Sequence, residues 1–156
     1  QAGKHHREEV WNMSMYDAIV ALETTCAGQT GGPAVVQVTP QDMEDLRPGK
    51  NCSSWLNLTP VKTPRKDETG GSYIADYTIK MSLWIAKPVK TNAKAMLKFA
   101  SDIWAVVITS IGTGHLGGYS RLDISPGQIN DTWESGDDGD IAYVIRAEIV
   151  VQKQEA

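Results

Sequence analysis

The stretch SYIADYTIKMSLWIAK, residues 72–87, decides the fold of this chain. Its residues alternate between an apolar phase and a mostly polar phase, the period of two expected of a strand with one buried face. The apolar phase comprises Tyr73, Ala75, Tyr77, Ile79, Met81, Leu83 and Ile85, and the polar phase comprises Asp76, Thr78, Lys80 and Ser82. We expect a long strand with antiparallel partners, because an antiparallel sheet can bury one face and leave the other in water.

Trp84 interrupts the polar phase of this strand. Tryptophan is enriched at protein interfaces, so one interpretation makes Trp84 part of a surface that binds a partner. The other interpretation places Trp84 under a loop of its own chain. Both fit the sequence.

The hydrophobic period changes to that of a helix between Asn92 and Ile111. We expect this helix to cover the sheet, because its apolar face and that of the long strand are the largest in the chain and each needs a partner. The predicted face comprises Ala93, Met96, Leu97, Ala100, Ile103, Trp104, Val107, Ile108 and Ile111. In this arrangement Ile79, Met81 and Leu83 pack against Ile103, Val107 and Ile108.

Residues 112–118, GTGHLGG, contain the pattern G-x-G-x-x-G of dinucleotide-binding turns. Such a site needs the glycines to follow a strand and open a helix, so that the N–H groups of the helix N-terminus face a pyrophosphate. Here Gly112 stands where a helix ends in a left-handed residue, and the predicted strand YSRLDIS, residues 119–125, comes next. This order is the reverse of the required one, so we expect no nucleotide cofactor.

Four further segments complete the element order. An amphipathic helix is predicted over Met15–Cys26, short strands over residues 34–39 and 54–59, and a long alternating strand over residues 141–152. Together they predict an α+β fold, an antiparallel β-sheet with an N-terminal helix and one long helix packed on one face.

Two charged segments are candidate contact regions. VKTPRKDETGG, residues 61–71, offers no apolar anchor and is predicted to be a mobile loop that becomes ordered against a partner. PGQINDTWESGDDGD, residues 126–140, is predicted to be an acidic loop, either a solvated turn or a weak calcium site, although it lacks the residue order of an EF-hand. The candidate interface residues are Lys62, Arg65, Lys66, Asp67, Glu68, Trp84, Asp137, Asp138 and Asp140.

Composition narrows the classes of protein. A chain of 156 residues supports one domain, here residues 13–156 with residues 1–12 as a peripheral extension. The formal net charge of −4 provides no general attraction to nucleic acid. No apolar run near the ~20 residues of a membrane span is evident, so we expect no membrane partner.

The reactive residues do not assemble into a recognisable site. Cys26 and Cys52 lack metal-ligand spacing, and His115 has no evident catalytic partner, so we expect no metal, no cofactor and no enzyme. One alternative is a stand-alone secreted binding module, because N-x-[ST] acceptor patterns occur at Asn12, Asn51, Asn57 and Asn130.

The element order resembles that of the tail terminator, or tail completion, proteins of long-tailed bacteriophages. The resemblance covers roughly residues 13–153. It rests on the helix around MYDAIVAL, the strand SWLNLTP, the long strand YIADYTIKMSLWIA, the helix NAKAMLKFASDIWAVVITSIG, the turn and strand LGGYSRLDIS, and the closing strand DIAYVIRAEIVVQ.

The resemblance implies a structural protein of the virion tail or neck, assembled in the host cytoplasm. Proteins of this family form a ring, usually a hexamer, on the head-proximal end of the tail tube. They end tube polymerisation and offer a docking surface to the head or neck connector. Genomic DNA passes through the ring without specific binding. Other neck or tube components share parts of this architecture, so they remain an alternative.

Overall fold

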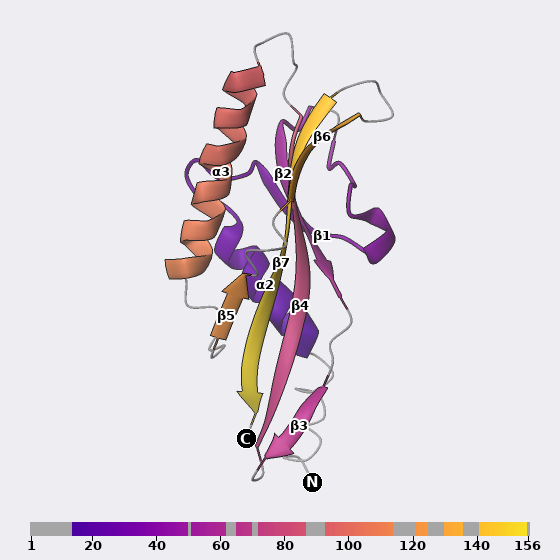
Figure 1. Cartoon of the computed structure of the whole chain (residues 1–156), viewed down its shortest axis with the longest axis vertical. Coiled ribbons are helices and arrows are strands. Elements are labelled where there is room, and N and C mark those ends of the chain that lie inside the picture. Colours follow the sequence, from indigo (N-terminus) through magenta and orange to yellow (C-terminus); the bar gives the residue numbers. More distant parts are fainter. Residues whose placement is uncertain are drawn as a thin grey trace.

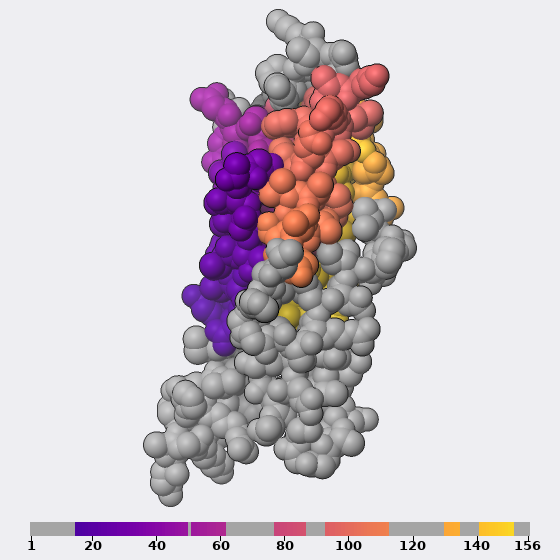
Figure 2. Space-filling model, turned by 90° about the vertical axis from the view of Figure 1, so that its left-hand side faces the viewer, coloured from indigo at the N-terminus to yellow at the C-terminus, as the bar shows by residue number. Residues whose placement is uncertain are grey.

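The computed structural model describes residues 14–49, 51–61, 65–69, 72–86, 93–113, 121–124, 130–135 and 141–155. Two helices, α2 (Ser14–Cys26) and α3 (Ala93–Thr113), lie side by side on one face of a twisted sheet (Figures 1 and 2). The segment between β1 and β2, which includes the short helix η1 (Gln41–Met43), lies on the opposite side of the sheet (Figure 1). This is the α+β fold expected from the sequence.

Two long strands form the centre of the sheet. β4 (Ser72–Ile85) and β7 (Ile141–Glu155) pair antiparallel without a break from Tyr73↔Glu155 to Ile85↔Tyr143. Both strands extend beyond the two helices at the end where β3 lies (Figure 1). A long two-stranded ribbon therefore runs through the whole described fold.

Short strands line the two outer edges of this ribbon. The outer edge of β4 is shared by β2 (Ser54–Pro60) and β3 (Arg65–Thr69). The outer edge of β7 is shared by β6 (Asn130–Ser135) and β5 (Arg121–Ile124). β1 (Val35–Val38) then pairs with β2, which makes β1 and β6 the lateral edges of the sheet at that end.

One strand pair departs from the predicted antiparallel sheet. β1 and β2 run parallel, with Val35 opposite Trp55 and Val38 opposite Leu58. The cause is the connection, because the chain crosses the second face of the sheet between Thr39 and Ser53 before β2 begins. A crossover of this kind brings consecutive strands into parallel pairing.

Two segments predicted to be loops contain strands. Arg65, Lys66, Asp67 and Glu68 belong to β3, so the prediction of an unstructured loop over residues 61–71 is wrong for this part. Likewise β6 lies inside the predicted acidic loop. The reason is that β4 and β7 expose backbone N–H and C=O groups along their whole length, and a polar segment can satisfy these groups as well as an apolar one.

The main core lies between the sheet and the helices. Ile79, Met81 and Leu83 are completely buried in the same cluster as Ile103 and Val107, which confirms most of the predicted packing. Ile108 is only half-buried, and Ala93 and Leu97 are exposed. The buried stripe of α3 is therefore narrower than predicted and comprises Met96, Ala100, Ile103, Val107 and Ile111.

Glycine ends one helix but not the other. Gly28, with φ of 69°, follows the last turn of α2, where Ala27 N donates to Glu23 O at 2.9 Å. This left-handed conformation is one that glycine adopts without steric cost. Gly112 lies inside α3 and has no positive φ, so its predicted role as the residue that ends the helix is wrong.

α3 is long and apolar enough to cross a membrane by length and composition, with a mean hydropathy of 1.4 over Ala93–Gly112. The expectation that the chain contains no apolar run near the ~20 residues of a membrane span does not hold by this measure. In the structure the buried stripe packs on the sheet, and Lys94, Lys98 and Asp102 are exposed. Of this stretch 28% is buried, along the stripe that packs on the sheet.

The packing of β4 on α3 predicts the effect of a buried charge. Leu83→Asp should lower the free energy of unfolding by about 4 kcal/mol or more, because an unpaired carboxylate would replace a completely buried side chain. Ala105→Asp adds the same charge at an exposed position of α3 and should cost less than about 1 kcal/mol. Urea unfolding followed by circular dichroism measures both. Equal stability of Leu83→Asp and wild type would contradict this core.

Candidate interaction surface

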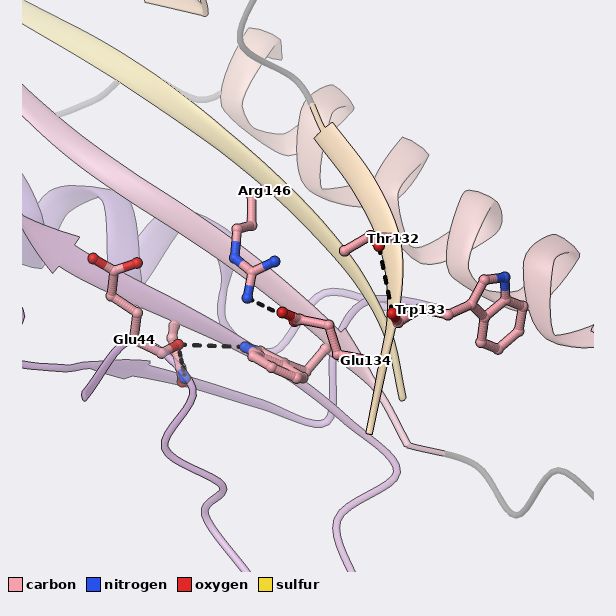
Figure 3. A network of polar contacts seen from close by, with 7 residues as sticks. Glu44, Thr132, Trp133, Glu134 and Arg146 are labelled. Atoms are coloured by element: carbon pink, nitrogen blue, oxygen red, sulfur yellow. Dashed lines mark hydrogen bonds and ion pairs between the residues drawn. The ribbon is translucent and has the colours of Figure 1, made fainter. Parts of the chain in front are cut away.

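Trp84 lies on the sheet face opposite the helices and is buried. Its side chain is 8% exposed and clusters with Trp55, Ala142 and Val144. The indole Nε1 donates to the carbonyl oxygen of Glu44, in the segment that crosses this face, at 3.3 Å (Figure 3). The interpretation that Trp84 lies under a loop of its own chain is confirmed. The other interpretation, an exposed Trp84 that contacts a partner, is wrong for the single subunit.

The stacked indoles of Trp55 and Trp84 are the centre of a row of side chains that runs across the sheet, with a guanidinium group at each end. Their ring centroids are 5.9 Å apart and their planes differ by 5°. Arg47 lies 5.2 Å from the centroid of Trp55, and Arg146 lies 5.4 Å from that of Trp84. Arg146 also forms an ion pair of 2.7 Å with Glu134 on β6 (Figure 3). The row therefore ties the crossing segment to β2, β4, β7 and the edge strand β6.

Strand register explains this row. Trp55 and Trp84 are direct partners in the β2–β4 ladder, which brings their side chains together on one face. Arg146 is two residues beyond Val144, the partner of Trp84 in the β4–β7 ladder, and so lies diagonally opposite Trp84. A guanidinium over a partly desolvated indole contributes about 0.5–2 kcal/mol. The row thus fixes the position of the crossing segment.

Asn57 holds the same segment from inside the sheet. It is completely buried and donates through Nδ2 to the carbonyl oxygens of Glu44 at 2.8 Å and Leu46 at 3.0 Å. Its Oδ1 accepts from Gln37 Nε2 at 2.9 Å. Asn57 cannot carry a glycan in this fold, which removes one of the four acceptor patterns. The carboxylate of Glu44 adds an ion pair of 3.4 Å with Lys80.

On the helix side of the sheet, β6 presents Trp133. Its ring meets the ring of Tyr143 edge to face, with the centroids 5.0 Å apart, and remains 38% exposed. The Tyr143 hydroxyl, on β7, donates to the carboxylate of Asp131, which lies on β6 with Trp133. Burial, followed by the hydrogen bond and the negative charge of Asp131, raises the pKa of Tyr143 to about 12. Tyr143 is therefore a fixed, neutral support beneath Trp133.

The exposed large apolar residues of the described chain fall into two groups according to the elements that carry them. The β1 side consists of Tyr16, Val38, Met43 and Leu46, which lie on α2, on β1 and in the crossing segment. The β6 side consists of Leu97, Trp133 and Ile141, which lie on α3, β6 and the start of β7. Figure 2 shows α2 at one side of the helix layer and β6 beyond α3 at the other.

The predicted contact residues lie elsewhere. Lys62, Asp137, Asp138 and Asp140 are outside the described residues, and Arg65 to Glu68 form β3 at the far end of the ribbon. Val38 and Trp133 are exposed residues that were not among the predicted contact residues. A usable signal existed for Trp133, a large aromatic residue in the middle of an otherwise polar segment. Nothing in the sequence marks Val38 as exposed. It belongs to the same β-branched run as Val35 and Val36, which are half-buried in the structure.

Two kinds of reactive group are relevant among the described residues, metal-binding clusters and the Cys26 thiol. The described residues contain no group of three or more His, Cys, Asp or Glu side chains placed to hold a metal ion. Cys26 is completely buried, and burial raises the pKa of its thiol to about 12, so the nucleophilic thiolate is suppressed.

Comparison with known proteins adds no assignment. No family model matches the chain, and no curated protein matches it at the significance required.

The stacked row predicts graded effects at Trp84. Trp84→Phe keeps an aromatic ring between Trp55 and Arg146 but loses the hydrogen bond to Glu44, so it should cost about 1–2 kcal/mol. Trp84→Ala also opens a cavity and should cost about 3–5 kcal/mol. Denaturant unfolding of both variants provides the measurement. An alanine variant no less stable than the phenylalanine variant would contradict a stabilising role for the stack.

The environment of Tyr143 predicts a pH dependence of stability. Its pKa rises from 10.0 to about 12 on folding, so the folded state holds this proton more tightly and stability is lost as the pH rises through that interval. The advantage of wild type over Tyr143→Phe should therefore shrink by about 1–3 kcal/mol between pH 10 and 12. Tyr16→Phe, at a residue that is 60% exposed, is the matched control. A constant difference between wild type and Tyr143→Phe over this interval would refute the assignment.

Proposed function

We propose that this chain is a structural protein of a bacteriophage tail that assembles into a ring, caps the tail tube, ends its polymerisation and presents a docking surface to the head or neck. The proposal joins the resemblance in element order to the observed α+β fold. The elements quoted for that resemblance occur in the same order in the structure, with β3 and β6 added between them.

The observation that carries the proposal is the state of the sheet edges. Within the described ranges, β1 pairs only with β2 and β6 pairs only with β7. Each edge also bears a large exposed apolar side chain, Val38 at 42% and Trp133 at 38%. Monomeric proteins usually protect such edges with charge, proline or a covering element. Two edges that are unpaired among the described residues, each with one large exposed apolar side chain, support a subunit whose neighbours complete it.

The central ribbon supports the same role. The ends of β4 and β7 with β3 extend beyond the helices (Figure 1), and β3 has the sequence RKDET. A projecting, charged hairpin next to a packed body is suited to contact a second ring or a tube subunit. A net charge of −4 is compatible with DNA that passes without binding.

The test is the assembly state of the purified chain. Light scattering after gel filtration should give a mass that is a multiple of 17.0 kDa, and negative-stain electron microscopy should show closed rings with a central channel. Single rings support a terminator, whereas rings that stack into tubes of indefinite length support the alternative of a tube component. A monomer at every concentration tested would overturn the proposal and favour a stand-alone binding module.

A further inference from the structure

We propose that the β6 side of one copy binds the β1 side of the next copy, head to tail, and that this contact is the one from which the assembly is built. The inference rests on the proposed function and identifies its first partner as a second copy of this chain. It follows from where the exposed apolar residues, the open strands and the exposed charges lie.

The two sides match in the kind of group they expose. The β1 side offers an open strand of four residues, Val35–Val38, and the β6 side offers one of six, Asn130–Ser135. Among the described residues neither outer edge pairs with a further strand, so each can continue the sheet into a neighbour. Since β1 and β6 are opposite edges at one end of a single sheet, their pairing would extend that sheet from copy to copy.

Apolar groups accompany both open strands. Met43 and Leu46 flank the β1 side at 42% and 39% exposure, and Ile141 and Leu97 flank Trp133 at 43% and 38%. Trp133 is held from below by Tyr143 and so is already ordered before a partner arrives. An ordered aromatic side chain loses little conformational entropy on binding, which is the property of a binding hot spot.

Exposed charges next to these residues differ between the two sides. On the β1 side, Asp42 and Asp45 adjoin Met43 and Leu46 in sequence and are exposed. On the β6 side, Lys94 lies one helical turn before Leu97 on α3, and Lys98 directly follows Leu97. Both lysines are exposed. Lys98 is paired with Asp102 at 2.9 Å, an exposed pair that contributes little and can be exchanged. The β6 side also carries the exposed Asp131, two residues from Trp133, so its charges are of both signs, whereas Asp42 and Asp45 are both acidic. Contact between two β1 sides is therefore opposed by like charge, and contact between a β1 side and a β6 side is not.

Contact between two different sides has a geometric consequence. A patch that binds itself yields a closed dimer, whereas two different patches yield a ring when the rotation closes and a filament when it does not. The β1 side and the β6 side share no residue and lie at opposite edges. Head-to-tail contact therefore leaves one free side on every incomplete assembly, to which a further copy adds.

The experiment uses one variant on each side. Val38→Lys should disable only the β1 side, and Trp133→Lys should disable only the β6 side. Each variant alone should remain a monomer, because every head-to-tail contact needs both sides. A one-to-one mixture should give a dimer and no larger species, because each pair retains one intact contact. Gel filtration with light scattering distinguishes these states.

Matched controls separate assembly from folding. Ala105→Lys adds the same charge on the exposed face of α3 and should assemble as wild type does. Melting temperatures identify a variant that does not fold, and then Leu46→Lys replaces Val38→Lys and Leu97→Lys replaces Trp133→Lys. A charge exchange in one chain, with Asp42 and Asp45 changed to Lys and Lys94 and Lys98 changed to Glu, should restore the assembly that either half of the exchange weakens.

The outcomes distinguish this inference from the proposed function. Rings that persist in both single variants would overturn the inference and leave the ring function standing. A dimer in the mixture, with wild type growing into open filaments, would support the inference and overturn the ring. A mixture that stays monomeric although both variants are folded and wild type assembles would overturn the head-to-tail contact.

Discussion

The pairing of β4 with β7 is the constraint on which the rest of the structure depends. Its register places Ile79 opposite Ile149, Met81 opposite Ala147 and Leu83 opposite Ile145, so one face of the ribbon is apolar across both strands. A shift of one residue would turn these side chains to the other face. The helices can cover only the apolar face, which fixes α2 and α3 on that side of the sheet. The outer edges of the ribbon then determine where every short strand pairs.

The second face is stabilised by a different kind of interaction. Trp55 and Trp84 stack there between two guanidinium groups, and Asn57 binds backbone carbonyl groups of the segment that crosses them. The described residues place no second layer of long helices on this face. The crossing segment covers it instead, held there by the polar and aromatic side chains beneath it. Both faces of the sheet are thereby covered over β2 and β4, by the helices on one side and by the crossing segment on the other. The row of stacked groups also reaches β6 through Arg146 and Glu134, so the packing of the interior holds the proposed contact strand in place.

The parts of the fold that could be predicted are those with strong local periodicity. The apolar face of the strand around Leu83 and the apolar stripe of the helix around Ile103 each had to pack against another element, and in the structure they pack in the same core. The parts that failed depend on pairing partners distant in sequence. β3 and β6 consist largely of polar residues and become strands because the long strands beside them leave hydrogen-bonding groups unsatisfied. The parallel pairing of β1 with β2 depends on the path of the crossing segment, for which local sequence carries no signal.

The sequence by itself determined the types of the long elements, the buried faces of the two long strands and the α+β class, because hydrophobic period is a local property that does not depend on the partner. Tertiary structure decided which large apolar residues remain exposed. Trp84 and Trp133 both interrupt polar stretches, yet Trp84 is 8% exposed and Trp133 is 38% exposed. The physical reason is position within the sheet. Trp84 lies on a central strand beneath the crossing segment, whereas Trp133 lies on an edge strand, and the exposure of a residue depends on what the rest of the chain places over it.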